Sequence, residues 1–247
     1  MPRAHRHYSP GLVWHITHRC HQREYLLRLL RDRKRWRHWL YVAQRRHGLC
    51  ILNYIVTCNH IHLLVKDRGN GEIARSMQLV AGRTAQEYNR REHRRGAFWE
   101  DRYHATAVQA DEHLARCITY IDLNMVRADV VDHPRDWRFS GYHELCNPPQ
   151  RKSVVDVPVL CELYRVTSVQ QLLAARDRAI NGEIAYSSRR AIWSSSAAVG
   201  NAGFLAEFQR SLGPAGIRKR CYRSEHGEYL REERPRYDVQ IGMESPN

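Results

Sequence analysis

The sequence is poor in acidic residues and has no long apolar run. Its 247 residues include 26 Asp and Glu against 40 Lys and Arg, which gives a formal net charge of +14. This excess favours a polyanionic partner, with nucleic acid ahead of an anionic membrane surface. No stretch approaches the roughly 18 uncharged apolar residues of a membrane span, and no apolar signal segment follows the basic N-terminus. We therefore expect a soluble, cytoplasmic protein with no membrane partner.

Paired cysteines are also missing. The seven cysteines are odd in number and contain no CxxC spacing, so the sequence gives no basis for a disulfide framework. Several of them, such as Cys50 and Cys117, lie within apolar runs, as reduced core thiols do. This usage is typical of a reducing compartment and agrees with a cytoplasmic location.

Apolar periodicity predicts an α+β fold. Alternating apolar residues begin at Val13 and predict a first strand. The apolar run 49–66 is too long for one strand and divides best near Cys58–Asn59, as a hairpin. Helices are predicted at 32–48, 71–96 and 111–131, and a fourth strand within 97–109. The expected architecture is a four-stranded, mainly antiparallel, ferredoxin-like sheet with helices packed on it.

A Pro-rich polar stretch at 146–153 predicts a domain boundary. We place one domain at 1–148 and a C-terminal extension at 149–247. Helical patterns at 168–184 and 203–212 indicate that the extension is mainly helical. The charged, tyrosine-bearing tail that follows them is expected to be partly disordered.

Two histidines stand one residue apart in the apolar stretch NYIVTCNHIHLLV. Side chains alternate along a strand, so His60 and His62 share one face while Ile61 and Leu63 point to the other. Two imidazoles at this spacing can both reach one metal ion. The pattern also fits two hydrogen-bonded histidines at a strand end, and the pair alone does not decide between these alternatives.

The predicted helix 111–131 carries two stripes of different character. Asp111 is its expected N-cap, and its buried face is made of Leu114, Ile118, Ile121 and Met125. On a second stripe lie Tyr120, Asn124 and Arg127, with Tyr120 and Asn124 one turn apart. A phenol beside an amide and a guanidinium, over a sheet that carries two histidines, could perform phosphoryl transfer. The alternative is an amphipathic tyrosine with Asn124 and Arg127 in solvent.

Three motifs, in their order along the chain, resemble one family. CNHIHLLV resembles the His–hydrophobic–His core of the HUH nucleases, and YIDLNMVRADVV is similar to the segment that bears the nucleophile in single-tyrosine HUH transposases. Between them, YNRREHRRGAFWEDRYHA resembles the family's N-x-R…G-x-x-W-x-x-R-Y stretch. The resemblance extends over residues 8–145 and points to the IS200-like transposases, with the REP-associated tyrosine transposases as the nearest branch. Met125 departs from the pattern, because proline is common there.

The resemblance implies an HUH catalytic domain at 1–148 with defined roles. His60 and His62 are implied as metal ligands, Asn124 as a third ligand and Tyr120 as the nucleophile. The implied cofactor is a divalent metal, Mg²⁺ or Mn²⁺, without a nucleotide cofactor. The implied substrate is single-stranded DNA beside a hairpin such as a REP-like palindrome, cut and rejoined through a 5′-phosphotyrosine. Relatives act as monomers or homodimers, and in this branch the C-terminal extension is associated with holding the hairpin.

Arginines around these motifs are candidates for contacts with DNA phosphates. They are Arg91, Arg94, Arg95, Arg102 and Arg127. For each of them, a solvated charged surface is the alternative. The histidines near the N-terminus, His15, His18 and His21, match no compact zinc signature, and we expect structural or DNA-facing roles for them.

Two other functions stay open at this point. A domesticated DNA-hairpin-binding protein would need no catalysis, although the joint presence of His60, His62, Tyr120 and Asn124 argues against it. A replication-initiator-type nickase would use a similar site, but the YIDLN…VRA segment favours the transposases. A covalent-adduct assay on single-stranded oligonucleotides would separate an enzyme from a binding protein.

Overall fold

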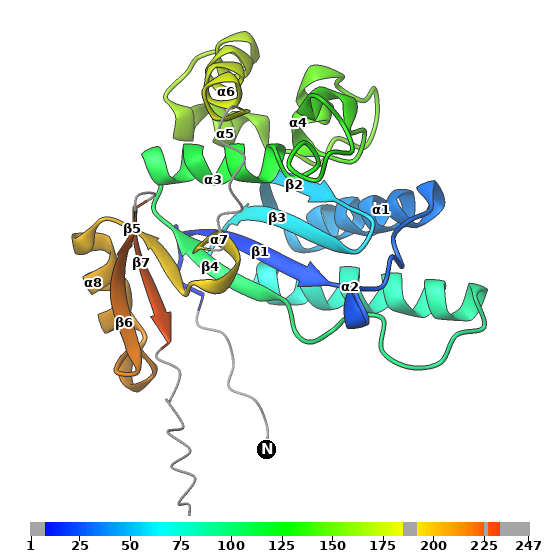
Figure 1. Cartoon of the computed structure of the whole chain (residues 1–247), viewed down its shortest axis with the longest axis horizontal. Helices are drawn as coiled ribbons and strands as arrows, with labels where there is room; N and C mark the ends of the chain where they lie inside the picture. Colours follow the sequence, from blue (N-terminus) through cyan, green and yellow to red (C-terminus); the bar gives the residue numbers. More distant parts are fainter. Residues whose placement is uncertain (1–7, 185–191, 225–226, 233–247) are drawn as a thin grey trace, which may run out of the picture.

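One seven-stranded sheet organises the chain (Figure 1). The computed structural model describes residues 8–184, 192–224 and 227–232. The strand order is β2-β3-β1-β4-β5-β7-β6, and every neighbouring pair is antiparallel except β4 and β5. The strands are β1 (Val13–Arg19), β2 (Cys50–Val56), β3 (His60–Lys66), β4 (His104–Val108), β5 (Ala198–Gly200), β6 (Lys219–Ser224) and β7 (Gly227–Glu232).

Helices cover both faces of the first four strands (Figure 1). The helices are α1 (Leu30–His47), α2 (Glu72–Arg91), α3 (Glu112–Asp122), α4 (Gly141–Cys146), α5 (Val157–Tyr164), α6 (Val169–Ile184), α7 (Ile192–Ser195) and α8 (Ala202–Ser211). On β2, Tyr54 faces Trp36 of α1, while its neighbour Asn53 donates a hydrogen bond to Asp122 at the end of α3. Because adjacent strand residues point to opposite faces, α1 and α3 lie on opposite sides of the sheet.

The predicted sheet was incomplete. The α+β class and the antiparallel pairing of β1 to β4 are confirmed, but the sheet has seven strands rather than four. The extension expected to be mainly helical supplies β5, β6 and β7 to this same sheet. Its strands escaped detection because β5 has three residues, and Leu230 is the one fully buried side chain of β6 and β7. The tail that was expected to be partly disordered contains β6 and β7 in its described part, and residues 225–226 and 233–247 lie outside the described residues.

The hairpin between β2 and β3 turns where the sequence predicts, at Thr57–Asn59. The Thr57 hydroxyl accepts hydrogen bonds from the backbone N–H groups of Asn59 and His60. A side-chain oxygen thus replaces the ladder partner that these N–H groups lack in the turn. The turn fixes where β3 starts and therefore which of its side chains face α3.

The helix predicted over 111–131 is shorter than expected. Asp111 caps it as predicted, with its carboxylate accepting from the N–H of His113, but α3 ends at Asp122. The Asn124 N–H then bonds to the Ile121 carbonyl three residues back, which tightens the chain into turns. Asn124 is therefore not on the helix of Tyr120 but in the turn that follows it.

A buried ion pair fastens α3 to the C-terminal extension. The guanidinium of Arg176, on α6, binds both carboxylate oxygens of Asp122, and its closest approach is 2.6 Å. Both side chains are 1% exposed, and Asn53 on β2 donates a further hydrogen bond of 2.8 Å to Asp122. The helix that carries Tyr120 is thus held between the sheet and α6.

Replacement of Arg176 with alanine is expected to lower the free energy of unfolding by about 3–5 kcal/mol, because it leaves the Asp122 carboxylate buried without its counter-charge. Urea denaturation followed by circular dichroism measures this change. The control is Arg35→Ala, which breaks a surface pair with Glu87 and should cost less than about 1 kcal/mol. Equal losses in the two variants would contradict the structural role of the buried pair.

No helix in the described ranges combines the length and apolar character that crossing a bilayer requires. All seven cysteines lie within these ranges, and each of them is free of a disulfide. The expectation of reduced thiols agrees with this arrangement.

Candidate active site

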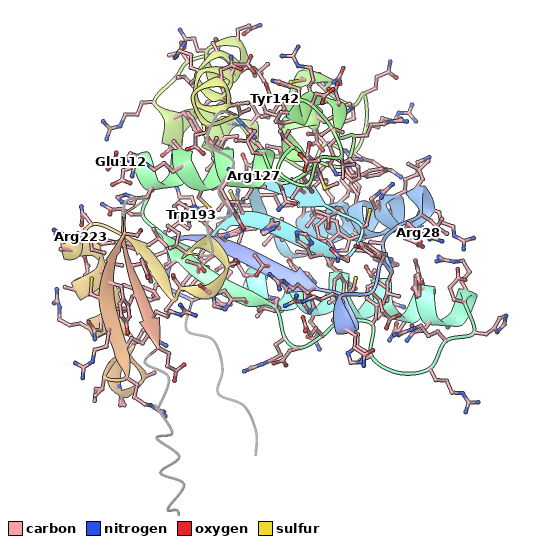
Figure 2. All side chains as sticks on the ribbon, in the orientation of Figure 1. Arg28, Glu112, Arg127, Tyr142, Trp193 and Arg223 are labelled. Carbon is pink, nitrogen blue, oxygen red and sulfur yellow. The ribbon has the colours of Figure 1, made fainter. Side chains whose placement is uncertain are left out.

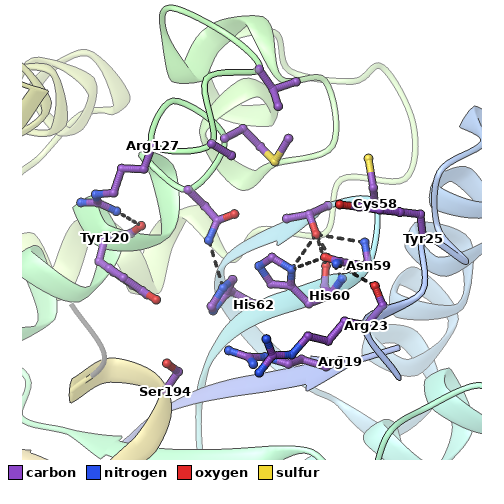
Figure 3. Close-up of a pocket in the computed structure, with 15 residues that line it drawn as sticks. Arg19, Arg23, Tyr25, Cys58, Asn59, His60, His62, Tyr120, Arg127 and Ser194 are labelled. Carbon is purple, nitrogen blue, oxygen red and sulfur yellow. Dashed lines mark hydrogen bonds between the residues drawn. The ribbon is translucent and has the colours of Figure 1, made fainter. Parts of the chain in front are cut away.

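The residues singled out from the sequence meet at one cavity of about 550 Å³ (Figure 3). His60 and His62 enter it from β3, Tyr120 from α3 and Asn124 from the turn after α3. The structure thus brings together all four residues proposed for chemistry, although the first and the last of them, His60 and Asn124, are 64 positions apart in the sequence.

His62 lies between Asn124 and a second histidine. The Nδ2 atom of Asn124 is 3.1 Å from Nε2 of His62, and Nε2 of His15 is 2.9 Å from its Nδ1. Burial lowers the pKa of His62 well below its ordinary value, and the proximity of two other imidazoles, His15 and His60, lowers it further. The ring is therefore neutral at physiological pH, and one of its nitrogens carries a lone pair.

His60 is held by the turn that precedes it. Its Nδ1 lies 2.8 Å from Oδ1 of Asn59 and 2.9 Å from the Thr57 hydroxyl. Since an amide oxygen can only accept, Nδ1 carries the proton, and in the neutral ring Nε2 has the lone pair. The His60 and His62 rings are nearly perpendicular, with centroids 5.0 Å apart.

The Tyr120 ring is packed edge-on against His62 and under a cation. Its centroid is 5.7 Å from that of His62, and the guanidinium carbon of Arg127 is 5.2 Å above the ring. Arg127 also donates a hydrogen bond of 2.9 Å to the Tyr120 carbonyl. Burial raises the pKa of Tyr120, while a hydrogen bond with Ser194 and the charge of Arg127 oppose this rise.

The donor set suits a divalent metal of intermediate softness. Among the described residues, no three His, Cys, Asp or Glu side chains form a metal-binding group, so a site here needs an amide ligand beside the two imidazoles. Asn124 qualifies, because a half-turn of its amide exchanges Nδ2 for Oδ1 opposite His62. Two neutral imidazoles and one amide oxygen form a set that Mn²⁺ accepts readily and Mg²⁺ accepts less well.

Of the five arginines predicted to contact DNA, Arg127 alone lines this cavity. Arg91 is paired with Asp32 and Glu92, and Arg94 with Glu24. Arg95 and Arg102 are exposed outside the cavity. In Figure 2, Arg127 lies centrally beside α3. The structure thus separates one arginine at the site from four elsewhere.

Among the cavity residues that the sequence analysis missed are Arg19, Arg23 and Ser194. Arg19 ends β1 opposite His60 in the sheet register, and Arg23 lines the same cavity (Figure 3). The strand alternation of β1 could have placed Arg19 on the histidine face. No local signal identifies Ser194, because it reaches Tyr120 only through the folding of the C-terminal extension.

Comparison with known families gives a match over the segment that builds this cavity. Residues 9–124 match the family described as "Transposase IS200 like". Residues 9–124 belong to the IS200-like transposase family. The matched region contains His60, His62, Tyr120 and Asn124. No curated protein matches the chain.

Two solved structures are similar to this chain. One is described as a REP-associated tyrosine transposase bound to a REP hairpin; it shares 20% identity over 63% of this chain and 94% of its own, with a TM-score of 0.49. The other, a candidate transposase from Deinococcus radiodurans R1, shares 18% identity over 44% of this chain and 87% of its own, with a TM-score of 0.34. The family assignment depends on the matched segment and not on these two likenesses.

Proposed function

We propose that this protein is a metal-dependent transposase that cleaves and rejoins single-stranded DNA beside a hairpin, with Tyr120 as its nucleophile. The observation that carries the proposal is the convergence of Tyr120, His60, His62 and Asn124 on one cavity rimmed by Arg19, Arg23 and Arg127. Phosphoryl transfer needs a nucleophile, a charge-stabilising group and cationic contacts to phosphate, and this cavity offers residues for each.

The proposed reaction is a transesterification. The Tyr120 oxygen attacks the scissile phosphorus, the bond from phosphorus to the 3′ oxygen breaks, and the 5′ phosphate stays on the tyrosine. The phenolic proton passes to solvent, and the released 3′ oxygen takes up a proton. Because the phosphotyrosine bond is again a phosphodiester, a 3′ hydroxyl can reverse the step and rejoin strands without a nucleotide cofactor.

His60, His62 and Asn124 are the residues that would hold the metal, Mg²⁺ or Mn²⁺. When bound, the ion would act as a Lewis acid that draws charge from the scissile phosphate. The chain's own contribution is to fix both imidazoles by hydrogen bonds at Nδ1, His60 by Asn59 and His62 by His15. Burial also lowers the pKa of His62, so that its Nε2 lone pair is available without a prior loss of a proton.

The arginines at the cavity suit the path of a single strand. Arg19 and Arg23 lie on one side of the histidines and Arg127 on the other (Figure 3). A backbone phosphate bound between them would place the scissile bond near Tyr120. We assign Arg127 to such a contact, whereas Arg91, Arg94, Arg95 and Arg102 would contact more distant phosphates. The hairpin substrate and the REP-associated branch follow from the motif resemblance and the net charge of +14.

The experiment that tests this function is a covalent-adduct assay on the full chain. A single-stranded oligonucleotide with a hairpin, taken from the DNA that flanks the gene and labelled at its 3′ end, is incubated with the protein and Mn²⁺. We expect a labelled band at the mass of protein plus the 3′ fragment on a denaturing gel. Tight binding of the hairpin without any adduct would instead identify a binding protein, and cleavage without an adduct would exclude the tyrosine mechanism.

A further inference from the structure

His15 occupies the centre of β1 on the same sheet face as the histidine pair. The register places His15 opposite Leu64 and Thr17 opposite His62, so His15 and His62 are diagonal neighbours on adjacent antiparallel strands. Their rings stack with centroids 5.0 Å apart and an interplanar angle of 12°. The side chain of His15 is fully buried and does not line the cavity. It reaches the cavity through two lining residues, His62 by a hydrogen bond and Tyr120 by an edge-on ring contact with centroids 6.1 Å apart.

The carbonyl of Trp193 determines which ring nitrogen of His15 carries the proton. Its oxygen lies 2.7 Å from Nδ1 of His15. A carbonyl oxygen can only accept, so Nδ1 is the protonated nitrogen. In the neutral ring, Nε2 then carries a lone pair, and this nitrogen lies 2.9 Å from Nδ1 of His62.

The hydrogen bond between His15 and His62 determines which ring nitrogen of His62 carries the proton. Since Nε2 of His15 accepts, Nδ1 of His62 donates, and Nε2 of His62 presents its lone pair toward Asn124 and the cavity. The geometry points to His15 as a positioning residue that, with the Trp193 carbonyl, holds His62 in the tautomer able to bind a metal. This inference rests on the proposed function, in which the Nε2 lone pair of His62 binds the metal.

Trp193 belongs to α7, in the C-terminal extension, and is itself fastened to the sheet. Thr106 on β4 donates to the carbonyls of Trp193 and Ser196, at 3.1 and 2.7 Å. Figure 2 shows Trp193 near β1 and β4, beneath α3. The segment beyond residue 150 therefore completes the hydrogen-bond chain that ends at His62, which gives the extension a role inside the site.

Loss of His15 would leave a buried donor on His62. Without this acceptor, the tautomer of His62 with its proton on Nε2 becomes the more stable one, because that N–H can donate a hydrogen bond to Asn124 or water. A protonated Nε2 cannot ligate a metal. Partners that fix a ligating histidine in this way typically contribute about 10–100-fold to metal affinity. His15 would thus change metal binding without touching the metal or DNA.

The tautomer can be measured without metal, DNA or any substitution of His15. Long-range ¹H–¹⁵N correlation NMR on the full chain reports which imidazole nitrogen is protonated, and a His62→Gln variant identifies the His62 signals. We expect His62 to be neutral, with the proton on Nδ1. A proton on Nε2 of His62 in the wild-type chain would overturn the inference.

The second measurement is Mn²⁺ affinity by titration calorimetry on the full chain without DNA. His15→Leu is expected to weaken Mn²⁺ binding by roughly 10–100-fold. His15→Gln should restore most of it, because the amide oxygen can accept from His62 and the amide nitrogen can donate to Trp193. The matched control is His18→Leu, a buried histidine on the opposite face of β1 whose Nε2 lies 2.8 Å from the Asp101 carbonyl.

Wild-type Mn²⁺ affinity in His15→Leu, or an equal loss in His18→Leu, would contradict a positioning role. The inference and the proposed function can fail separately. If His62 has the expected tautomer and His15→Leu weakens Mn²⁺ binding, the inference stands even when the protein forms no covalent adduct with DNA. In that case only the transposase chemistry would be wrong.

Discussion

Replacement of Tyr120 with phenylalanine is expected to abolish the covalent adduct and to reduce DNA cleavage by about 10⁴-fold or more, as removal of a nucleophile does in other enzymes. Phenylalanine keeps the ring that packs against His62 and under Arg127, and removes only the oxygen. The fold and the binding of DNA should therefore be retained. The measurement is the denaturing-gel assay with a 3′-labelled oligonucleotide, beside a filter-binding assay for affinity.

Tyr88→Phe is the matched control for this substitution. Tyr88 is a partly buried tyrosine on α2 with a guanidinium, that of Arg91, 5.1 Å from its ring centroid, as Arg127 lies over Tyr120. Its ring packs against Phe98 and lies outside the cavity. We expect wild-type adduct formation from Tyr88→Phe. An undiminished adduct in Tyr120→Phe would remove Tyr120 from the mechanism, whatever the control shows.

The local part of the site was predictable because it depends on alternation and turns. The period of two along β3 places His60 and His62 on one face, and Asn59 and Thr57 in the preceding turn hold the His60 ring by hydrogen bonds. Asn124 was predicted to lie beside Tyr120 on one continuous helix, and this reason proved incomplete. The helix ends before it, but the tight turn at Ile121 keeps it on the side of His62.

The contacts from the C-terminal extension could not be predicted from local patterns. Ser194 reaches Tyr120, and the Trp193 carbonyl reaches His15 across 178 positions of sequence. A backbone carbonyl carries no residue-type signal, and α7 is four residues long. The sequences of β6 and β7 also give no local signal for a strand, because most of their side chains are not buried and show no apolar alternation. Such features follow from how the sheet is extended rather than from composition.

The arginines predicted to contact DNA stay a prediction, and the folded chain places them in different surroundings. Clustering in the sequence predicted a phosphate-binding patch at 91–95, but in the folded chain Arg91 and Arg94 are paired with carboxylates. Arg19 is separated from that cluster and still lies at the cavity, because the strand register brings it opposite His60. Charge density along a sequence thus indicates the kind of partner better than the position of its contacts.

The double substitution His60→Ala with His62→Ala is expected to eliminate cleavage while leaving DNA affinity within a few-fold of wild type. The imidazoles supply two of the three proposed metal ligands, and an amide alone does not hold Mg²⁺ or Mn²⁺ without further donors. In the proposed mechanism the phosphate contacts come instead from arginines such as Arg19 and Arg127, and the counterions that these contacts release from DNA favour binding. Cleavage assays in EDTA, and after the return of Mn²⁺, measure the dependence directly.

Three results together would establish that the histidine pair acts through a metal. Wild-type protein should lose cleavage in EDTA and regain it with Mn²⁺, whereas the His60→Ala, His62→Ala variant should stay inactive at every Mn²⁺ concentration. The control His133→Ala with His143→Ala removes two hydrogen-bonded imidazoles that lie outside the cavity, and it should behave as wild type. Full cleavage in EDTA would show that the two histidines serve a purpose other than metal binding.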